Sequence, residues 1–304
     1  MMDNILIEKI KQLKKEKNAV ILAHYYQNDE VQMIADYVGD SLALAQIASQ
    51  NQADILVFCG VDFMAETAKI LSYDKKVLLP NKNASCSMAN MIDAIELMKY
   101  KSQNPDTVVV AYVNSRANIK ALADVCVTSS NALKIIDFYQ SQNKKILYCP
   151  DQNLAKYAMK LRGYNFDAWH GYCAIHNNID LKRVKEIKAK YPNALFIAHP
   201  ECKLDVLNLA DYIGSTKQLI DFVNKSSSKE FIIATEIGVL YEMKKNNPEK
   251  KFIPLSEDLR CNDMKLIHLE DIYNCLLNES NEISIDIKIA QKAKKSLDKM
   301  LELS

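Results

Sequence analysis

Short apolar runs alternate with segments of helical periodicity along the whole chain. First runs of β-branched and other apolar residues lie at 19–23, 107–111 and 194–198, and second runs lie at 54–60, 145–151 and 231–236. Helical stretches such as 62–71 and 151–161 follow, and then shorter apolar runs, clearest at 75–80 and 250–255. This alternation of strand and helix is typical of α/β proteins with parallel sheets.

The same unit is written three times. The segment ADYVGDS begins at Ala35, ADVCVTS at Ala123 and ADYIGST at Ala210, with offsets of 88 and 87 residues. A period of this length corresponds to a domain rather than to a solenoid repeat. We therefore predict three similar three-layer α/β/α domains with short parallel sheets, arranged around a pseudo-threefold axis.

Turn residues place the domain boundaries. Asn-Pro-Asp at 104–106 and Tyr-Pro-Asn at 191–193 each precede an apolar run. The predicted domains are 1–104, 105–192 and 193–284. The last segment, 285–304, has helical periodicity, and we expect it to pack onto the first domain.

Polar residues recur at fixed distances from the three marker alanines. Eleven residues before them stand His24, Tyr112 and His199; nine before stand Tyr26, Asn114 and Glu201; six after stand Ser41, Ser129 and Thr216. The ends of parallel strands share one edge of a sheet, where such folds bind ligands. Three copies around one axis would bring these nine side chains to a single central cavity.

Two interpretations of the hydroxyl residues stay open. Ser41, Ser129 and Thr216 precede helical stretches, so each hydroxyl could simply cap a helix. Alternatively, the three helix starts could bind an anion through free N–H groups and the helix dipole. The two roles are compatible, and a strand-end histidine can likewise be hydrogen-bonded scaffolding.

Three cysteines follow the same period. Cys86, Cys173 and Cys261 are separated by 87 and 88 residues, and each lies in a polar loop. A structural zinc site usually has four ligands, whereas a catalytic metal keeps an open position. Iron–sulfur clusters are ordinarily held by cysteine thiolates, and a four-iron cluster with three of them leaves one iron free as a Lewis acid. A three-thiolate zinc lyase or hydrolase and a non-catalytic iron–sulfur carrier or sensor are the competing interpretations.

The other cysteines do not form such a set. Cys126 and Cys275 are expected in the core, and Cys202 beside the site. Cys59 and Cys149 stand at nearly matching strand ends, with Thr235 in the third copy, and are expected at the cavity edge at most. His170 and His176 flank Cys173 either as supporting partners of a metal site or as surface residues.

Composition narrows the function classes. The 304 residues carry a net charge of +1, which gives no overall attraction to nucleic acid or to anionic membranes. There is no G-x-G-x-x-G or Walker sequence, no Cys-x-x-Cys pair, no apolar run near the ~20 residues of a membrane span, and no signal peptide at the N-terminus. We expect a cytoplasmic enzyme with no nucleic-acid or membrane partner.

Several motifs together resemble the quinolinate synthase family. These are AHYYQ, GVDFMAETAKIL, CSMAN, YVNS, HPEC, ADYIGST and TEIG, in the family's order from about residue 18 to the end of the chain. The resemblance implies three α/β domains about a pseudo-threefold axis. It also implies condensation of iminoaspartate with dihydroxyacetone phosphate to quinolinate, with loss of phosphate and two waters. An aspartate oxidase or dehydrogenase would supply the iminoaspartate.

The resemblance also implies a cofactor and residue roles. A [4Fe-4S] cluster with one open iron would be held by Cys86, Cys173 and Cys261 and would act as a Lewis acid in dehydration. Proton transfers would fall to Glu201, Tyr26, His199 and Tyr112. Substrate binding would involve His24, Ser41, Tyr112, Asn114, Ser129, His199, Glu201 and Thr216.

The chain departs from the family pattern at a few positions. The family more often carries Asn in place of Tyr25, a small residue in place of Arg116 and an acidic residue in place of Asn118. We expect Arg116 to point outward as a solvated loop charge; if it pointed inward it would alter phosphate affinity. The alternative function is a three-thiolate metal-dependent lyase acting on another small phosphorylated or polycarboxylate substrate.

Overall fold

The computed structural model describes residues 2–304 and contains three four-stranded parallel sheets. The first has the order β2-β1-β3-β4, with β1 (Ala19–His24), β2 (Tyr37–Gly39), β3 (Ile55–Cys59) and β4 (Lys76–Leu78). The second has the order β6-β5-β7-β8, with β5 (Thr107–Tyr112), β6 (Val125–Val127), β7 (Lys145–Cys149) and β8 (Asp167–Ala168). The third has the order β10-β9-β11-β12, with β9 (Leu195–Ala198), β10 (Tyr212–Ile213), β11 (Glu230–Ala234) and β12 (Lys251–Pro254). The shared order confirms the predicted α/β class with three similar units.

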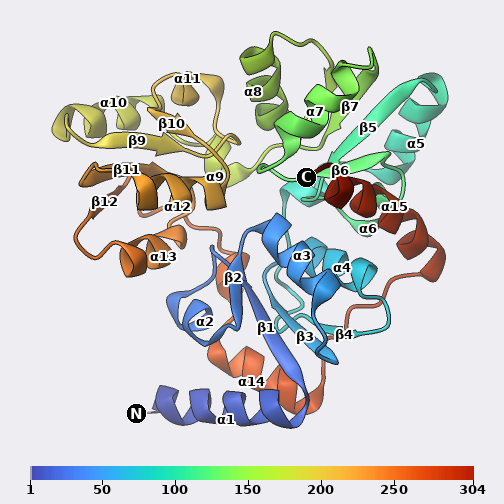
Figure 1. Ribbon diagram of the computed structural model, residues 1–304, viewed down its shortest axis with the longest axis vertical. Helices are drawn as coiled ribbons and strands as arrows, with labels where there is room; N and C mark the ends of the chain where they lie inside the picture. The colour runs from blue at the N-terminus through green and yellow to red at the C-terminus, as the bar shows by residue number, and fades with distance from the viewer. Residues whose placement is uncertain (1) are drawn as a thin grey trace.

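The sheets form three lobes around a common centre (Figure 1). The helices of the first lobe are α1 (Met2–Glu16), α2 (Asp29–Ile34), α3 (Ser41–Gln50) and α4 (Asp62–Leu71). Those that follow are α5 (Ala94–Gln103), α6 (Ala117–Lys120), α7 (Ala132–Gln140), α8 (Gln152–Arg162), α9 (Ala174–Asn177) and α10 (Leu181–Lys190). The remainder are α11 (Leu204–Leu207), α12 (Thr216–Lys225), α13 (Val239–Asn246), α14 (Leu269–Asn278) and α15 (Ile287–Leu303), with 3₁₀ turns at Met88–Asn90 and Met264–Leu266.

The central strands are buried on both faces. Every residue of β3 is buried, and in β7 and β11 only the first residue is not. Parallel strands covered by helices on both sides read as continuous apolar runs rather than as alternating ones, which is why the sequence pattern identifies them. No helix within residues 2–304 has both the length and the apolar character needed to cross a membrane.

Two helices pack with the sheet that follows them. Leu97 of α5 shares a core with Val109 and Leu147 of the second sheet. Val184 of α10 shares a core with Phe196 of the third sheet. In the sequence, α5 and α10 precede the predicted domain boundaries after residues 104 and 192, and those boundaries stay predictions.

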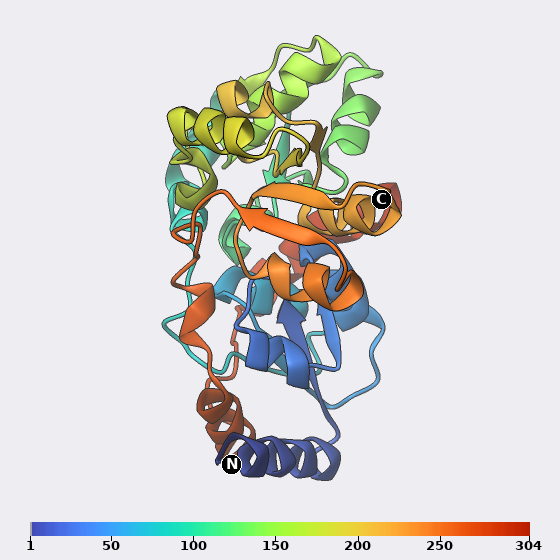
Figure 2. The same ribbon diagram turned by 90° about the vertical axis from the view of Figure 1, so that its left-hand side faces the viewer.

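The C-terminal part of the chain returns across the lobes. Helix α14 lies beside α1, and both views show this pair at one end of the molecule (Figure 1 and Figure 2). Helix α15 packs chiefly on α6 and β6 of the second lobe and less extensively on α4 of the first. The expected packing on the first domain is therefore only the smaller part of its contact.

Candidate active site

One cavity gathers the side chains that the repeat pattern singles out. All nine strand-end and helix-start residues, and the three periodic cysteines, line it together with the further residues Asp40, Ser85, Thr128, His176 and Glu236. The strand register explains the convergence. Ala23, Ala111 and Ala198 pair with Cys59, Cys149 and Ala234 respectively, so the residues that follow these alanines are structurally equivalent.

The first set lies at the end of the first strand of each unit: His24 and Tyr112 are the last residues of β1 and β5, and His199 directly follows β9. All three are buried. Burial lowers the pKa of His24 to about 3, and the neighbouring His199 and Lys265 add to the effect. Burial also lowers the pKa of His199 to about 3, against the opposing influence of Glu201. Both imidazoles are therefore neutral near pH 7.

The second set contains the one carboxylate of the nine. Burial alone would raise the pKa of Glu201, but His199, the hydrogen bond from His176 and Tyr112 outweigh it and lower the pKa to about 2. The Nδ1 atom of His176 lies 2.8 Å from Glu201 Oε2, and that of His199 lies 3.6 Å from it. Burial and the charge of Glu201 raise the pKa of Tyr112 well above its usual value. The cavity thus holds an ionised carboxylate beside neutral donors.

The third set does not cap the helices. Asp40 caps α3 by accepting from Ala43 N, and Ser215 caps α12 by accepting from Gln218 N. Ser41 and Thr216 are the first residues of those helices, so their hydroxyls are not used as caps. Ser129 does not stand at a helix start as expected, because it lies in the turn before α7, whose N-cap position is Asn131. Its Oγ lies 3.3 Å from His199 Nε2.

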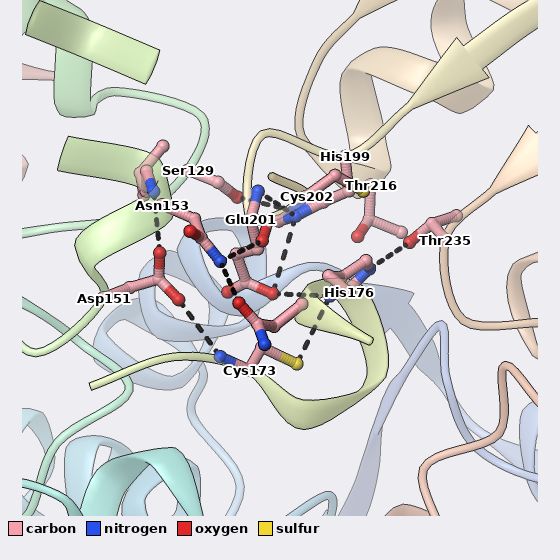
Figure 3. Close-up of polar contacts among 12 residues, drawn as sticks. Ser129, Asp151, Asn153, Cys173, His176, His199, Glu201, Cys202, Thr216 and Thr235 are labelled. Atoms are coloured by element: carbon pink, nitrogen blue, oxygen red, sulfur yellow. Dashed lines mark hydrogen bonds and ion pairs between the residues drawn. The ribbon is translucent and has the colours of Figure 1, made fainter. Parts of the chain in front are cut away.

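A series of hydrogen bonds links Glu201 to Tyr26. Figure 3 shows its first part, from Glu201 through His176 to Thr235. A carboxylate can only accept, so the His176 Nδ1 carries the hydrogen that points at Glu201 Oε2. In the neutral ring Nε2 is then an acceptor, and Thr235 donates to it over 2.9 Å. Thr235 can in turn accept from the Tyr26 hydroxyl, 2.8 Å away. Donation therefore runs in one direction along the series, from Tyr26 through Thr235 and His176 to Glu201.

The three periodic thiols line the same cavity from three different loops. All are free, and burial raises the pKa of Cys86 to about 12 and that of Cys261 to about 11. Burial and the charge of Glu201 raise the pKa of Cys173 well above its usual value. A thiol whose pKa is raised in this way becomes a thiolate only beside a compensating cation.

The spacing of the thiols bears on the kind of centre. Two thiolates on one zinc ion, each at ~2.3 Å, stand no more than ~4.6 Å apart. Among the described residues, the group whose ligand atoms all lie within 4.8 Å of one another is Cys173, His176 and Glu201, not the three cysteines. A centre with several metal ions therefore fits the three thiols better than a single ion does.

Two carboxylates near the cysteine loops, Asp151 and Glu236, were not predicted from the sequence. Asp151 and Glu236 lie two residues beyond Cys149 and Ala234, so they are structurally equivalent, and Val61 takes this place in the first unit. Asp151 Oδ2 accepts from Cys173 N and Glu236 Oε1 accepts from Cys261 N. The available signal was an acidic residue at the last position of the second run in two of the three repeats.

The remaining cysteines lie outside the cavity lining. Cys59 and Cys149 are buried in the sheets, and their counterpart in the third unit is Ala234 rather than Thr235. Cys202 is buried, and its thiol points at Ala234 O over 3.6 Å. None of the three is placed to contact a ligand in the cavity.

Arg116 is neither free in solvent nor part of the cavity lining. Its Nη1 lies 2.6 Å from Asp62 Oδ2, and its Nε donates to Asn90 Oδ1 over 3.0 Å. The guanidinium therefore ties the start of α6 to α4 and to the loop that carries Cys86. The expectation of a solvated charge is wrong in this respect, because the side chain is ion-paired and only partly exposed.

Comparison with known proteins agrees with this geometry. The family model described as "Quinolinate synthetase A protein" matches residues 8–302. A quinolinate synthase of Clostridioides difficile (strain 630) is 48% identical over 304 residues, covering 100% of this chain and 99% of that protein. A quinolinate synthase of Alkaliphilus metalliredigens (strain QYMF) is also 48% identical, covering 100% of both chains. One of Microcystis aeruginosa (strain NIES-843) is 46% identical over 304 residues, covering 98% of this chain and 95% of its own.

Proposed function

This chain belongs to the quinolinate synthetase A family and is an enzyme, and on that premise we propose the reaction that its cavity carries out. Iminoaspartate condenses with dihydroxyacetone phosphate to give quinolinate, phosphate and two waters. Carbon, nitrogen and phosphorus balance, and no external oxidant is required. The observation that carries the proposal is the convergence of nine polar groups and three thiols, from three equivalent units, on one cavity.

The three periodic cysteines would hold an iron–sulfur cluster. Cys86, Cys173 and Cys261 come from three separate loops, are free, and are too far apart as a set for one ion. When bound, a [4Fe-4S] cluster with three thiolate ligands supplies a Lewis-acidic iron that assists loss of a substrate hydroxyl as water. The other steps depend on side chains of the protein.

Anionic groups of the substrates would bind at the helix starts. Ser41 and Thr216 begin α3 and α12, where backbone N–H groups and the helix dipole favour a phosphate or a carboxylate. Ser129 and the neutral His24 and His199 add donors to the cavity lining. Within residues 2–304 the buried amide oxygen of Asn114 has no hydrogen-bond partner, and an unmade hydrogen bond of this kind costs about 1–3 kcal/mol. A substrate O–H or N–H would satisfy it.

Proton transfers would centre on Glu201. Its carboxylate is ionised at neutral pH and so is free to take a proton from substrate carbon or nitrogen, and substrate binding would have to raise its low pKa for it to be an effective base. Tyr26 keeps its hydroxyl proton because burial and the charge of Glu201 raise its pKa well above the usual value, so it serves as a donor. The path through His176 and Thr235 would carry a proton from Tyr26 toward Glu201 without bulk water, and the return from Glu201 to Tyr26 would require every hydrogen bond along it to reverse. Tyr112 and His199 would donate to developing oxyanions.

The supply of substrate and the location follow from this chemistry. An aspartate oxidase or dehydrogenase would furnish iminoaspartate. We propose a cytoplasmic location, where thiols that must ligate a metal stay reduced.

Metal analysis with an assay tests the proposal. Protein purified without oxygen should contain about four irons and four sulfides per chain, show a brown colour that air bleaches, and form quinolinate from the two substrates. One zinc and no sulfide would instead support a three-thiolate metal-dependent lyase acting on another small phosphorylated or polycarboxylate substrate. A full cluster without quinolinate formation would overturn the substrates but not the cofactor.

A further inference from the structure

We propose that Asp151 and Glu236 are positioning residues that hold the loops of Cys173 and Cys261 in place for the metal centre. The inference rests on the proposed function for what the thiols bind, but it concerns side chains that the repeat pattern and the reaction leave without a role. It begins from the equivalence of the two positions. Each residue stands two places beyond the strand residue that pairs with Ala111 or Ala198.

Asp151 holds the Cys173 loop with both carboxylate oxygens. Oδ1 accepts from Leu154 N at 2.7 Å and so caps α8, while Oδ2 accepts from Cys173 N at 3.2 Å (Figure 3). The side chain is fully buried, so both oxygens depend on these donors. The backbone continues the contact: Gln152 N donates to Gly171 O at 2.8 Å. A Cβ at Gly171 would stand 2.8 Å from Pro150 O, so glycine is required for this close approach.

Glu236 holds the Cys261 loop in the same manner. Oε1 accepts from Cys261 N at 3.1 Å and Oε2 from Gly238 N at 2.6 Å, so the carboxylate joins the end of β11 to the cysteine loop. Lys265, four residues after Cys261, lies 3.4 Å from Oε1. Its Nζ also donates to Tyr26 O at 2.6 Å. The loop is thereby anchored both to its own sheet and to the first unit.

In the first unit the Cys86 loop is held by a different kind of side chain. Val61 occupies the equivalent place and offers no acceptor to the Cys86 loop. Arg116 reaches across from the second unit instead, and it donates to Ser85 Oγ at 3.3 Å and to Asn90 Oδ1 at 3.0 Å. These two residues lie on either side of Cys86. Each cysteine loop is thus fixed by a charged side chain from outside the loop.

The position of the cysteine loops affects how firmly the metal centre is held. A thiolate ligand holds its metal only while the loop presents the sulfur at the bonding position, and partners beyond the ligands commonly contribute 10–100-fold to metal affinity. Asp151→Asn and Glu236→Gln keep side-chain volume but replace one acceptor oxygen with an NH₂ group. Whichever way the amide is oriented, one backbone N–H loses its partner or faces another donor. The loop loosens, and the cluster becomes easier to remove.

The experiment measures iron release from holoenzyme prepared without oxygen, with excess ferrous chelator. Asp151→Asn and Glu236→Gln should release iron about 10–100-fold faster than wild type, and the EPR spectrum of the reduced cluster should shift. Asp180→Asn is the control for the helix cap: Asp180 likewise caps a helix, α10, by accepting from Lys182 N, but within residues 2–304 it accepts from no N–H of a cysteine loop. It should leave both the rate and the spectrum unchanged.

The outcomes separate the two proposals. If wild-type protein holds a cluster and both carboxylate variants match it in release rate and spectrum, the positioning role is overturned. If wild-type protein holds no iron or sulfide, the proposed function fails and this inference with it. Should Asp151→Asn not fold, because it also weakens a helix cap, Glu236→Gln decides alone, since Glu236 caps no helix. An equal acceleration in Asp180→Asn would show a general loss of stability and count against the proposal.

Discussion

Glu201 Oε2 and His176 Nδ1 lie 2.8 Å apart, although the two residues stand in different repeats of the sequence. Glu201 follows the first strand of the third unit, and His176 belongs to α9, just after the Cys173 loop. The same histidine contacts Cys173 Sγ at 3.3 Å and Thr235 Oγ1 at 2.9 Å. It therefore connects the thiol, the carboxylate and the hydroxyl chain that leads to Tyr26.

Replacing Glu201 by Gln should stop turnover without removing the cluster. The amide has nearly the same shape but cannot accept a proton, and loss of a general acid–base group commonly costs about 10²–10⁴-fold in rate. Quinolinate formation gives kcat, and iron analysis gives the cluster content. An unchanged kcat would show that another residue handles the protons.

Replacing Thr235 by Val should lower kcat while KM stays near the wild-type value. Valine matches the shape of threonine but breaks the hydrogen-bonded path between His176 and Tyr26. Thr107→Val is a suitable control, because Thr107 is also a buried threonine but lies at the opposite end of a strand, β5. Steady-state kinetics of both variants test this prediction. A kcat of Thr235→Val equal to that of wild type would exclude the path through Thr235.

Replacing Cys86, Cys173 or Cys261 by Ser should abolish activity and sharply reduce the iron content. Each variant removes one of the three thiols that line the cavity. Cys275→Ala is the control, because this thiol is buried in α14, away from the site, and should leave iron unchanged. Full activity in Cys173→Ser would contradict the assignment of ligands.

Acid should destabilise the protein through its buried histidines. His24 and His199 have pKa values of about 3 in the fold and near 6.5 when unfolded, so the unfolded chain binds more protons between these values. The free energy of unfolding therefore falls as pH decreases below 6.5. Glu201, with a pKa of about 2 against 4.5, adds to the loss only below about pH 4.5.

The histidine contribution can be isolated with His24→Asn, which keeps an acceptor for Tyr26 N. The fall in stability between pH 6.5 and 5, measured by denaturant unfolding, should be smaller in the variant than in wild type. Other titrating groups, including Asp151 and Glu236 with their raised pKa values, are common to both proteins and cancel in the comparison. Identical pH profiles would mean that His24 has the same pKa in the folded and unfolded chain, and would contradict the prediction.

Replacing Arg116 by Ala should lower stability but leave KM for the phosphorylated substrate unchanged. The guanidinium is bound to Asp62 and Asn90 rather than directed into the cavity. Partly exposed ion pairs of this kind contribute about 0.2–1 kcal/mol, so the melting temperature should fall only slightly. A marked rise in KM would show that Arg116 reaches the phosphate.

Most of the fold, and many of the residues that line the cavity, can be predicted from the repeat in the sequence. Fully buried parallel strands are continuous apolar runs, and three copies of the same run pattern imply three copies of the same sheet. The polar residues at strand ends could be found because a repeated position after each strand has the same place in each unit. His24, Tyr112 and His199 are recognisable for this reason, and so are the three periodic cysteines.

Contacts between units could not be predicted in this way. The pairing of Glu201 with His176, and the bond from Lys265 to Tyr26, join segments that no periodicity relates. Helix α15 shows the same limit: its amphipathic pattern predicts an apolar face, but not that the face is covered by α6 and β6. Nor did the pattern separate the caps Asp40 and Ser215 from the neighbouring Ser41 and Thr216.

The sequence by itself determined the three α/β units, the two central strands of each, and the set of strand-end and cysteine positions. Only the tertiary structure decided which of those side chains touch, which carboxylates support the cysteine loops, and where Arg116 and α15 pack. The physical reason is that strand formation depends on local burial patterns that repeat with the chain. Hydrogen bonds between lobes depend on how three separate sheets are brought together, and that arrangement has no counterpart in the linear spacing of residues.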